Sequence, residues 1–229
     1  MDGVDRPHPA RRHVGAHRKV ALNGGSIARW HAAKHRGKWL LLQNKYEEAW
    51  QAFDMNGEFE KLLGSMEKMS RPQRQLQLPA FLAMVSARYE ALIRYAGKLS
   101  SYLENNFALV ERVSKLLPEN HPQRVPLSGT AGLLRWKSWN LLKVEKLTLD
   151  RYRTDAIRIL KKAMNDPGQY AEAWQWSAAL GDMELDDAEL RKSLFRKGIE
   201  QLKSIPETEM SSTDKKELLA ILEQALKAG

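Results

Sequence analysis

The sequence predicts an all-α protein without a β-sheet, and three observations support this prediction. Apolar residues recur at helical spacing over most of the chain. No segment combines alternating β-branched residues with a hairpin turn. Proline and glycine gather in short stretches that would separate helices. The hydrophobic and charged fractions, 43% and 28%, are ordinary for a globular protein, and 229 residues suffice for one domain of moderate size or two small ones.

The longest periodic pattern covers residues 78–117. Steps of four and three from Leu78 place an apolar or aromatic residue at eleven of twelve positions, which is the period of a helical seam. We therefore expect one long central helix here, the longest of the fold. Gly97 and the pair Asn105–Asn106 are the two places where this helix would bend or break instead.

A helix of this length needs a partner, and two alternatives remain open. In the first, two copies of the chain associate through residues 78–117, and the single polar residue of the seam, Asn106, selects register and partner number. In the second, the helix packs within the chain against residues 26–53 and the C-terminal helices. Asn106 then marks a break.

The N-terminal residues 1–25 combine prolines and glycines with many arginines and histidines, so we expect a basic, mostly disordered arm. A solvated tail, a nucleic-acid-binding arm and a targeting segment are the alternatives.

Ser26 is a plausible N-cap for a helix that ends at Phe53. His31 and His35 share a face of that helix, but no cysteine and no nearby glutamate completes a zinc site, so we expect a basic face and no metal.

Three prolines and two glycines mark residues 118–132 as a connector. It separates an N-terminal helical half, residues 26–117, from a C-terminal half, residues 133–229. The C-terminal half opens with a helix from Leu133 towards Lys146. Trp136 and Trp139 share a face of this helix, where they could pack inward or form a contact surface.

Two segments carry the pattern of a small residue followed four positions later by a large one. Ala49 and Phe53 form such a pair in Tyr46-Glu47-Glu48-Ala49-Trp50-Gln51-Ala52-Phe53, and Ala156, Leu160 and Ala163 precede Pro167 in the second segment. This order resembles the second helix of tetratricopeptide repeats, and Ala171-Glu172-Ala173-Trp174 resembles the start of a further repeat. The resemblance covers about a third of the chain and implies a helical protein-binding adaptor without catalysis. Ser177 and Ala178 stand where that family prefers a Leu-Gly pair.

The net charge of +9 is concentrated in two blocks. Residues 1–45 hold ten Lys and Arg against two acids, and residues 121–164 hold ten against three. Such blocks favour an anionic partner, and cations interleaved with aromatic rings suit nucleic acid, RNA or DNA. We expect a site where both blocks converge. Its cations would be Arg29, Lys34, Arg36, Lys38, Arg135, Lys137, Arg151, Arg153 and Arg158, with Trp136 and Tyr152 as stacking platforms.

No phosphate-binding glycine loop, nucleophile elbow or zinc motif occurs, so we expect no enzyme activity, no catalytic residue, no cofactor and no metal. No apolar run is long enough to span a membrane, and we expect a soluble intracellular protein. The composition favours a structural or accessory protein that binds nucleic acid. The alternatives are a helical-repeat adaptor and an oligomeric protein of a viral or ribonucleoprotein assembly.

Overall fold

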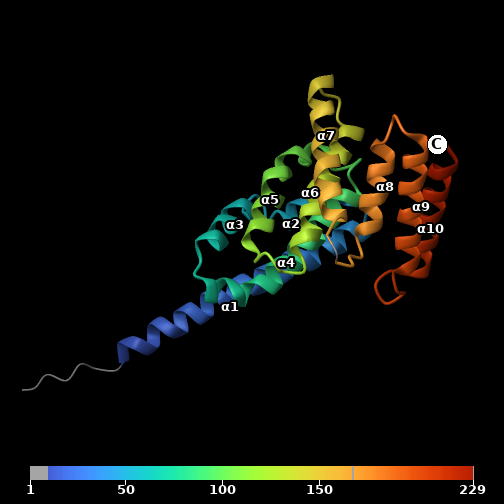
Figure 1. Ribbon diagram of the computed structural model, residues 1–229. Helices are drawn as coiled ribbons and strands as arrows, with labels where there is room; N and C mark the ends of the chain where they lie inside the picture. The colour runs from blue at the N-terminus through green and yellow to red at the C-terminus, as the bar shows by residue number, and fades with distance from the viewer. Residues whose placement is uncertain (1–9, 167, 229) are drawn as a thin grey trace, which may run out of the picture. The chain divides into compact units, whose positions relative to one another are not determined.

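The computed structural model describes residues 10–166 and 168–228, with side chains from Gly25 onwards. In these residues the chain forms ten α-helices and two short 3-10 helices, with no strand (Figure 1). This confirms the predicted all-α class. The chain divides into two compact units, Met1–Ala91 and Leu92–Gly229, and the division falls in the last turn of helix α4.

The first unit is built from four helices. Three rings form the centre of its core: the centroid of Phe81 lies 5.1 Å from that of Trp30 and 6.2 Å from that of Phe59. Ala49 and Phe53 are also fully buried, as the small–large pair predicts. The helices are α1 (Ala10–Leu42), α2 (Tyr46–Phe53), α3 (Phe59–Lys68) and α4 (Arg71–Arg94).

The predicted helix from Ser26 to Phe53 is wrong at its start and in its interior. The helix α1 already begins at Ala10, and residues 43–45 separate it from α2. Asn44 has a φ of 59°, a left-handed conformation that asparagine tolerates better than most residues and that ends a helix. Of the predicted, mostly disordered arm over residues 1–25, residues 10–25 are helical in α1, so the prediction is wrong there, and residues 1–9 lie outside the described part of the chain.

A buried arginine joins three helices of the first unit. The Arg88 guanidinium carbon lies 4.1 Å from the ring centroids of both Trp50 and Phe59, and its Nη1 donates to Asp54 Oδ1 at 2.7 Å. The Arg88 side chain is 1% exposed and that of Asp54 28%. Burial lowers the pKa of Arg88, and the neighbouring Tyr89 and Asp54 oppose this shift. Two ring faces and one carboxylate thus compensate for the lost hydration of the cation.

The same ion pair holds an unusual loop between α2 and α3. Asp54 is followed by Met55, Asn56 and Gly57, whose φ angles are 54°, 57° and 87°. Left-handed conformations are unfavourable for residues other than glycine, so surrounding contacts must hold them in place. The hydrogen bond from Arg88 to Asp54 anchors the first residue of this loop.

The predicted single helix over residues 78–117 is also wrong. Helix α4 begins earlier, at Arg71, and ends at Arg94. The short helices η1 (Ser100–Tyr102) and η2 (Glu104–Asn106) then lead to α5 (Phe107–Leu116). The longest helix is therefore not within this segment, because α1 has 33 residues and α4 has 24.

The break lies at the two places that the sequence indicated, Gly97 and Asn106. Leu99 and Leu103 are fully buried within it, so the turn still places the periodic apolar residues in a core. Asn106 is 2% exposed, and its Nδ2 donates to the Tyr102 carbonyl oxygen at 2.6 Å. Asn106 thus lies at a break, as the second alternative requires, while association between copies stays a prediction.

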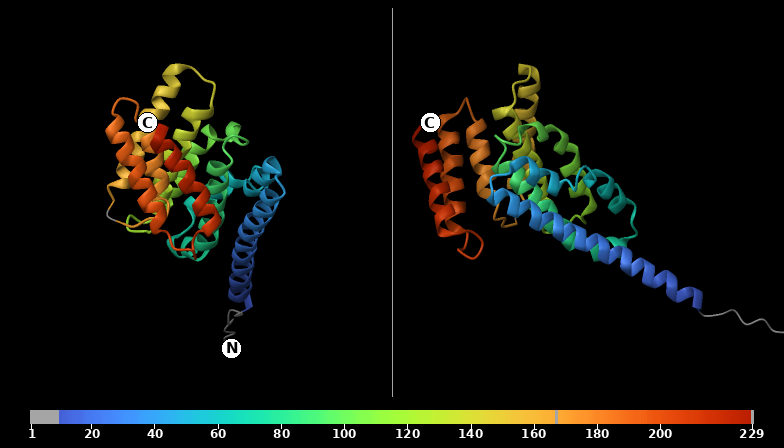
Figure 2. Two further views of the ribbon diagram at one scale, coloured as in Figure 1. Left: turned by 90° about the vertical axis from the view of Figure 1, so that its right-hand side faces the viewer. Right: turned by 180° about the vertical axis from the view of Figure 1, so that it is seen from behind.

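After α5, the second unit has five further helices, and each of them packs against the next one along the chain. The helices α8, α9 and α10 lie side by side in Figures 1 and 2. One core contains Leu133, Leu160 and Trp176, and another, between the last three helices, contains Phe195 and Leu222. The helices are α6 (Arg124–Leu141), α7 (Lys146–Met164), α8 (Ala173–Met183), α9 (Ala188–Ser204) and α10 (Ser212–Ala228).

The predicted connector over residues 118–132 is mostly helix, because α6 begins at Arg124. Pro126 lies in its first turn, where a missing N–H costs no helical hydrogen bond. A Cβ added to Gly129 would lie 2.4 Å from the Trp176 ring, and one added to Gly132 would lie 2.7 Å from Leu160. The two glycines therefore allow α8 and α7 to pack closely on α6. They do not mark a flexible link.

No helix in the described part of the chain has the length and apolar character that a membrane span requires.

Candidate nucleic-acid interface

The predicted stacking platform Trp136 lies in a polar cluster between α6 and α8. Its Nε1 donates to Asp182 Oδ2 at 2.7 Å, and Asn140 Nδ2 donates to the same oxygen at 2.9 Å. The Lys137 ammonium lies 3.9 Å from the centroid of the Trp136 ring. Burial lowers the pKa of Lys137, and the Asp182 carboxylate opposes this shift. Trp139 packs against the same core as Trp136. This arrangement favours the inward-packing alternative for both rings.

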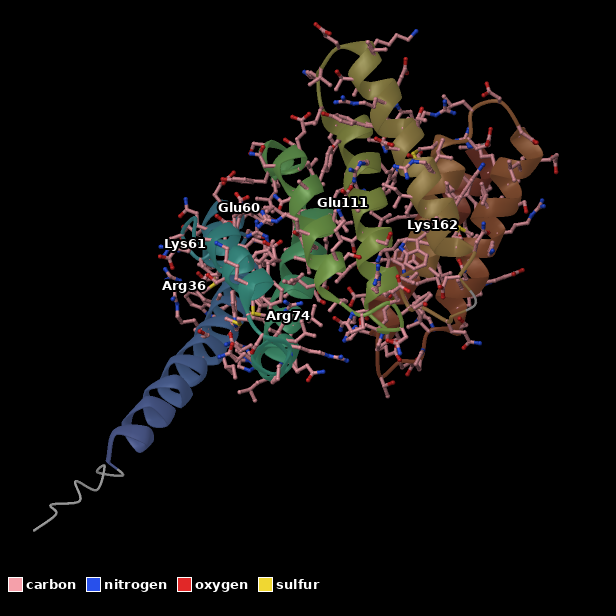
Figure 3. All side chains as sticks on the ribbon, turned by 60° about the vertical axis from the view of Figure 1, so that its left-hand side comes forward. Arg36, Glu60, Lys61, Arg74, Glu111 and Lys162 are labelled. Atoms are coloured by element: carbon pink, nitrogen blue, oxygen red, sulfur yellow. The ribbon has the colours of Figure 1, made fainter. Side chains whose placement is uncertain are left out.

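Arg135 connects α6 to α5. Its Nη2 donates to Glu111 Oε1 at 2.6 Å, and its Nη1 donates to the Ala131 carbonyl oxygen at 3.0 Å. The guanidinium carbon lies 4.6 Å from the centroid of the Phe107 ring. Figure 3 labels Glu111 on α5. With a side chain only 12% exposed, Arg135 has little surface left for a phosphate.

Tyr152 and Arg153 also have partners inside the second unit. The buried Tyr152 hydroxyl donates to Glu104, and the Tyr152 and Phe107 rings pack edge to face with centroids 5.3 Å apart. Arg153 donates from Nε and Nη2 to the carbonyl oxygen of Met183, at 2.9 Å and 2.6 Å. Met183 is the last residue of α8, where a cation is favourable because the helix dipole is negative there.

The outward face of α7 is different, because its cations are exposed. Arg151 and Arg158 lie on it, and so do Lys161 and Lys162, which the sequence placed in the basic block but not among the predicted site residues. At 100° and 1.5 Å per residue these four cations fall within an arc of about 100° and extend over about 16 Å. Figure 3 labels Lys162 on this helix.

Two carboxylates flank this face, Asp150 and Asp155. Asp155 Oδ1 lies 3.0 Å from Arg158 Nη2, but the Arg158 side chain is 68% exposed. An exposed ion pair of this kind, between residues three apart on one helix, contributes little to stability. The opposite face of α7 is buried through Ala156 and Leu160. Packing on that side fixes which cations point outward.

The predicted residues on α1 also differ in their partners and in their exposure. Arg29 forms an ion pair with Glu58 of the same unit, and Lys34 is half-buried. Arg36, labelled in Figure 3, and Lys38 are exposed. Trp39, which was not among the predicted site residues, is exposed as well, at 58%.

The predicted convergence of the two basic blocks would join residues of different units, so it stays a prediction. Within each unit, the exposed candidates are Arg29, Arg36 and Lys38 on α1, and Arg151 and Arg158 on α7, of which Arg29 and Arg158 each form an ion pair. The spacing of Lys161 and Lys162 from Arg158, three and four residues, is a signal of a shared helical face that could have identified them.

In the part of the chain that the structure describes, no group of three or more histidines and carboxylates is placed to hold a metal ion. No protein-family model, curated protein or solved structure matches this chain. The resemblance to tetratricopeptide repeats therefore stays a prediction, although Ala49, Phe53 and Ala156 are buried as such packing requires.

Proposed function

We propose that the chain is a non-enzymatic accessory or structural protein that binds nucleic acid through the outward face of α7. The observation that supports this proposal is the row of four exposed cations, Arg151, Arg158, Lys161 and Lys162, on one face of a helix whose other face is buried. We call these four residues the α7 cation row.

The chemistry of this row suits a phosphate backbone. Duplex DNA carries one negative charge about every 1.7 Å along its axis, so a row about 16 Å long can lie beside several phosphates. The long side chains of Arg and Lys reach such charges without requiring a particular base sequence. Binding would therefore tolerate many sequences and would serve to hold or package a strand.

Counterion release makes this proposal measurable. Each neutralised phosphate contributes about 0.9 to the slope of log affinity against log salt on duplex DNA and about 0.7 on a single strand. Four contacts from the α7 cation row would contribute roughly 3. Fluorescence anisotropy of a labelled oligonucleotide, titrated with protein at several salt concentrations, measures this slope.

The deciding comparison uses two triple charge reversals. Replacing Arg151, Arg158 and Lys162 with Glu should reduce the slope by roughly 2 and weaken binding strongly at low salt. The control reversal has the same change in net charge. It replaces three exposed residues of α9 and α10, namely Arg196, Lys197 and Lys216. Equal losses in both variants would show that net charge alone attracts the strand, and the α7 site would be wrong.

Lys215 is unsuitable for the control. Its ammonium donates to the carbonyl oxygens of Lys203 and Ile205, at the C-terminal end of α9. Reversal there would remove a structural contact together with a charge, so a loss of binding could reflect a loss of structure.

A second candidate function, a protein-binding adaptor, is supported by a different surface. Leu141, Val144 and Leu147 are 41%, 38% and 81% exposed around the turn between α6 and α7. Apolar side chains gathered at one exposed turn favour contact with another protein. Binding through this turn would depend little on salt, so the same salt titration distinguishes the two functions.

A further inference from the structure

Trp39 is exposed on the outer face of α1, and no other Trp, Tyr or Phe with a described side chain is. The remaining rings are buried or half-buried, including Trp136 and Tyr152. The Trp39 side chain is 58% exposed, so much of its large apolar surface is not buried and does not stabilise the fold. Such a ring in a basic setting is available to a ligand.

The surroundings of Trp39 combine a rigid support with positive charge. On the inner side of α1, Trp30 and Leu40 are 2% and 3% exposed, so the helix is anchored in its core. On the outer side, His35 lies one turn before Trp39, and Lys38 and Arg36 are exposed beside it. Residues 25–42 of α1 contain neither Asp nor Glu, and the Glu58 carboxylate pairs with Arg29, ten positions before Trp39.

We propose that this surface binds single-stranded nucleic acid, with an unpaired base stacked on Trp39 and neighbouring phosphates held by Lys38 and Arg36. The inference rests on the proposed function and names the form of nucleic acid. Aromatic side chains bind unpaired bases of any sequence through their π-faces, while cations follow the backbone. Bases inside a duplex are already stacked on one another, so an indole on a helix surface reaches only unpaired ones.

A membrane surface is the main competing partner for a basic helix with an exposed tryptophan. Interfacial helices insert a broad apolar face beside a strongly charged one. Here the broad apolar face of α1 is buried within the first unit, through Trp30, Ala33 and Leu40. Among residues 25–42, the part of α1 with described side chains, Trp39 and Leu42 are the two large apolar ones left exposed, which is little to insert into lipid. The observations therefore favour single-stranded nucleic acid over a lipid bilayer as the partner of this surface.

The test compares three labelled probes: a twelve-residue oligothymidylate, an abasic strand of equal phosphate number, and a twelve-base-pair duplex, for which Trp39→Ala should change nothing because its bases are paired. Wild-type protein should bind the thymidylate more tightly than the abasic strand, by roughly 5- to 100-fold, because one base stacks on the indole. Trp39→Ala should lose this preference and leave the affinity for the abasic strand unchanged. Trp39→Phe should retain part of it, since a smaller ring still stacks.

The matched control is Leu42→Ala, which removes a neighbouring side chain that is 85% exposed. It should change no affinity by more than about twofold. The salt slope should be the same in wild type and Trp39→Ala, because stacking releases no counterions. Circular dichroism of each variant checks that the helix content is unchanged.

The outcomes separate the two proposals. If wild-type protein binds none of the probes, the proposed function fails and this inference fails with it. If wild-type protein binds with a steep salt dependence and Trp39→Ala binds identically, only the stacking site is overturned. Two further results would overturn it while showing another role for Trp39. In the first, Trp39→Ala loses binding to vesicles of phosphatidylserine and phosphatidylcholine, while its affinity for the probes is unchanged. In the second, Trp39→Ala loses self-association in sedimentation, while its affinity for the probes is again unchanged.

Discussion

Arg88 in the first unit and Arg158 in the second are both helical arginines beside an aspartate, yet their surroundings are opposite. The Arg88 side chain is 1% exposed and lies between two aromatic rings, with Asp54 at 2.7 Å. Arg158 is 68% exposed, and its partner Asp155 is three residues away on the same helix. The first arginine is part of a core, and the second is available to solvent and to a ligand.

The contrast explains why a count of charges does not locate a binding surface. Residues 121–164 carry ten Lys and Arg, but Arg135 and Arg153 already hold other elements of the second unit together. The cations that remain accessible on α7 are those whose side chains point away from the packed face. Burial and partner geometry, rather than total charge, define the surface that we propose to bind a strand.

The largest expected effect is on the free energy of unfolding, when the aspartate beside each arginine, Asp54 or Asp155, is replaced. Asp54→Ala leaves the buried Arg88 charge without its carboxylate and should lower the free energy of unfolding by roughly 3 kcal/mol, as expected for a broken buried ion pair. Asp155→Ala removes an exposed pair and should cost less than about 1 kcal/mol. Urea unfolding followed by circular dichroism measures both values. Similar losses in the two variants would mean that the surroundings of Arg88 do not make it a core residue.

A smaller effect is expected at Lys137, whose surroundings lie between these extremes. Burial lowers the pKa of its ammonium in the folded state below the ordinary value of 10.5, so the unfolded state binds this proton more tightly. The resulting penalty is fully present below the folded pKa, and it disappears as the pH rises through the unfolded value.

The stability of the wild type should therefore rise, relative to Lys137→Met, as the pH is raised from 7 towards about 10. Urea unfolding of both proteins at matched pH values measures this difference. A relative fall over the same range would show that attraction to Asp182 outweighs burial at this position.

The fold class could be predicted from the sequence because helical periodicity is local. The break near Gly97 and Asn106 was visible for the same reason, since both residues weaken a helix. The roles of Gly129 and Gly132 could not be predicted, because they depend on Trp176 and Leu160, which approach from other helices. Composition alone made these glycines resemble a linker.

The candidate site was only partly predictable, for a related reason. Arg135 and Arg158 have similar sequence surroundings, but Glu111, the partner of Arg135, lies 24 residues away and carries no local signal. Lys161 and Lys162 were within reach, because their spacing from Arg158 places them on one helical face. Trp39 could not be separated from Trp30 and Trp50, since exposure depends on what packs against each ring.

Lysine labelling by acetylation, read by mass spectrometry with and without a twelve-residue oligothymidylate, tests the central claim most directly. In the free protein, Lys161 and Lys162 should react fast and Lys137 slowly, because the first two are exposed and the third is half-buried against the Trp136 ring. The oligonucleotide should protect Lys161 and Lys162 and leave Lys197 and Lys216 unchanged. Fast labelling of Lys137, or equal protection of all four exposed lysines, would contradict the division between structural and binding cations.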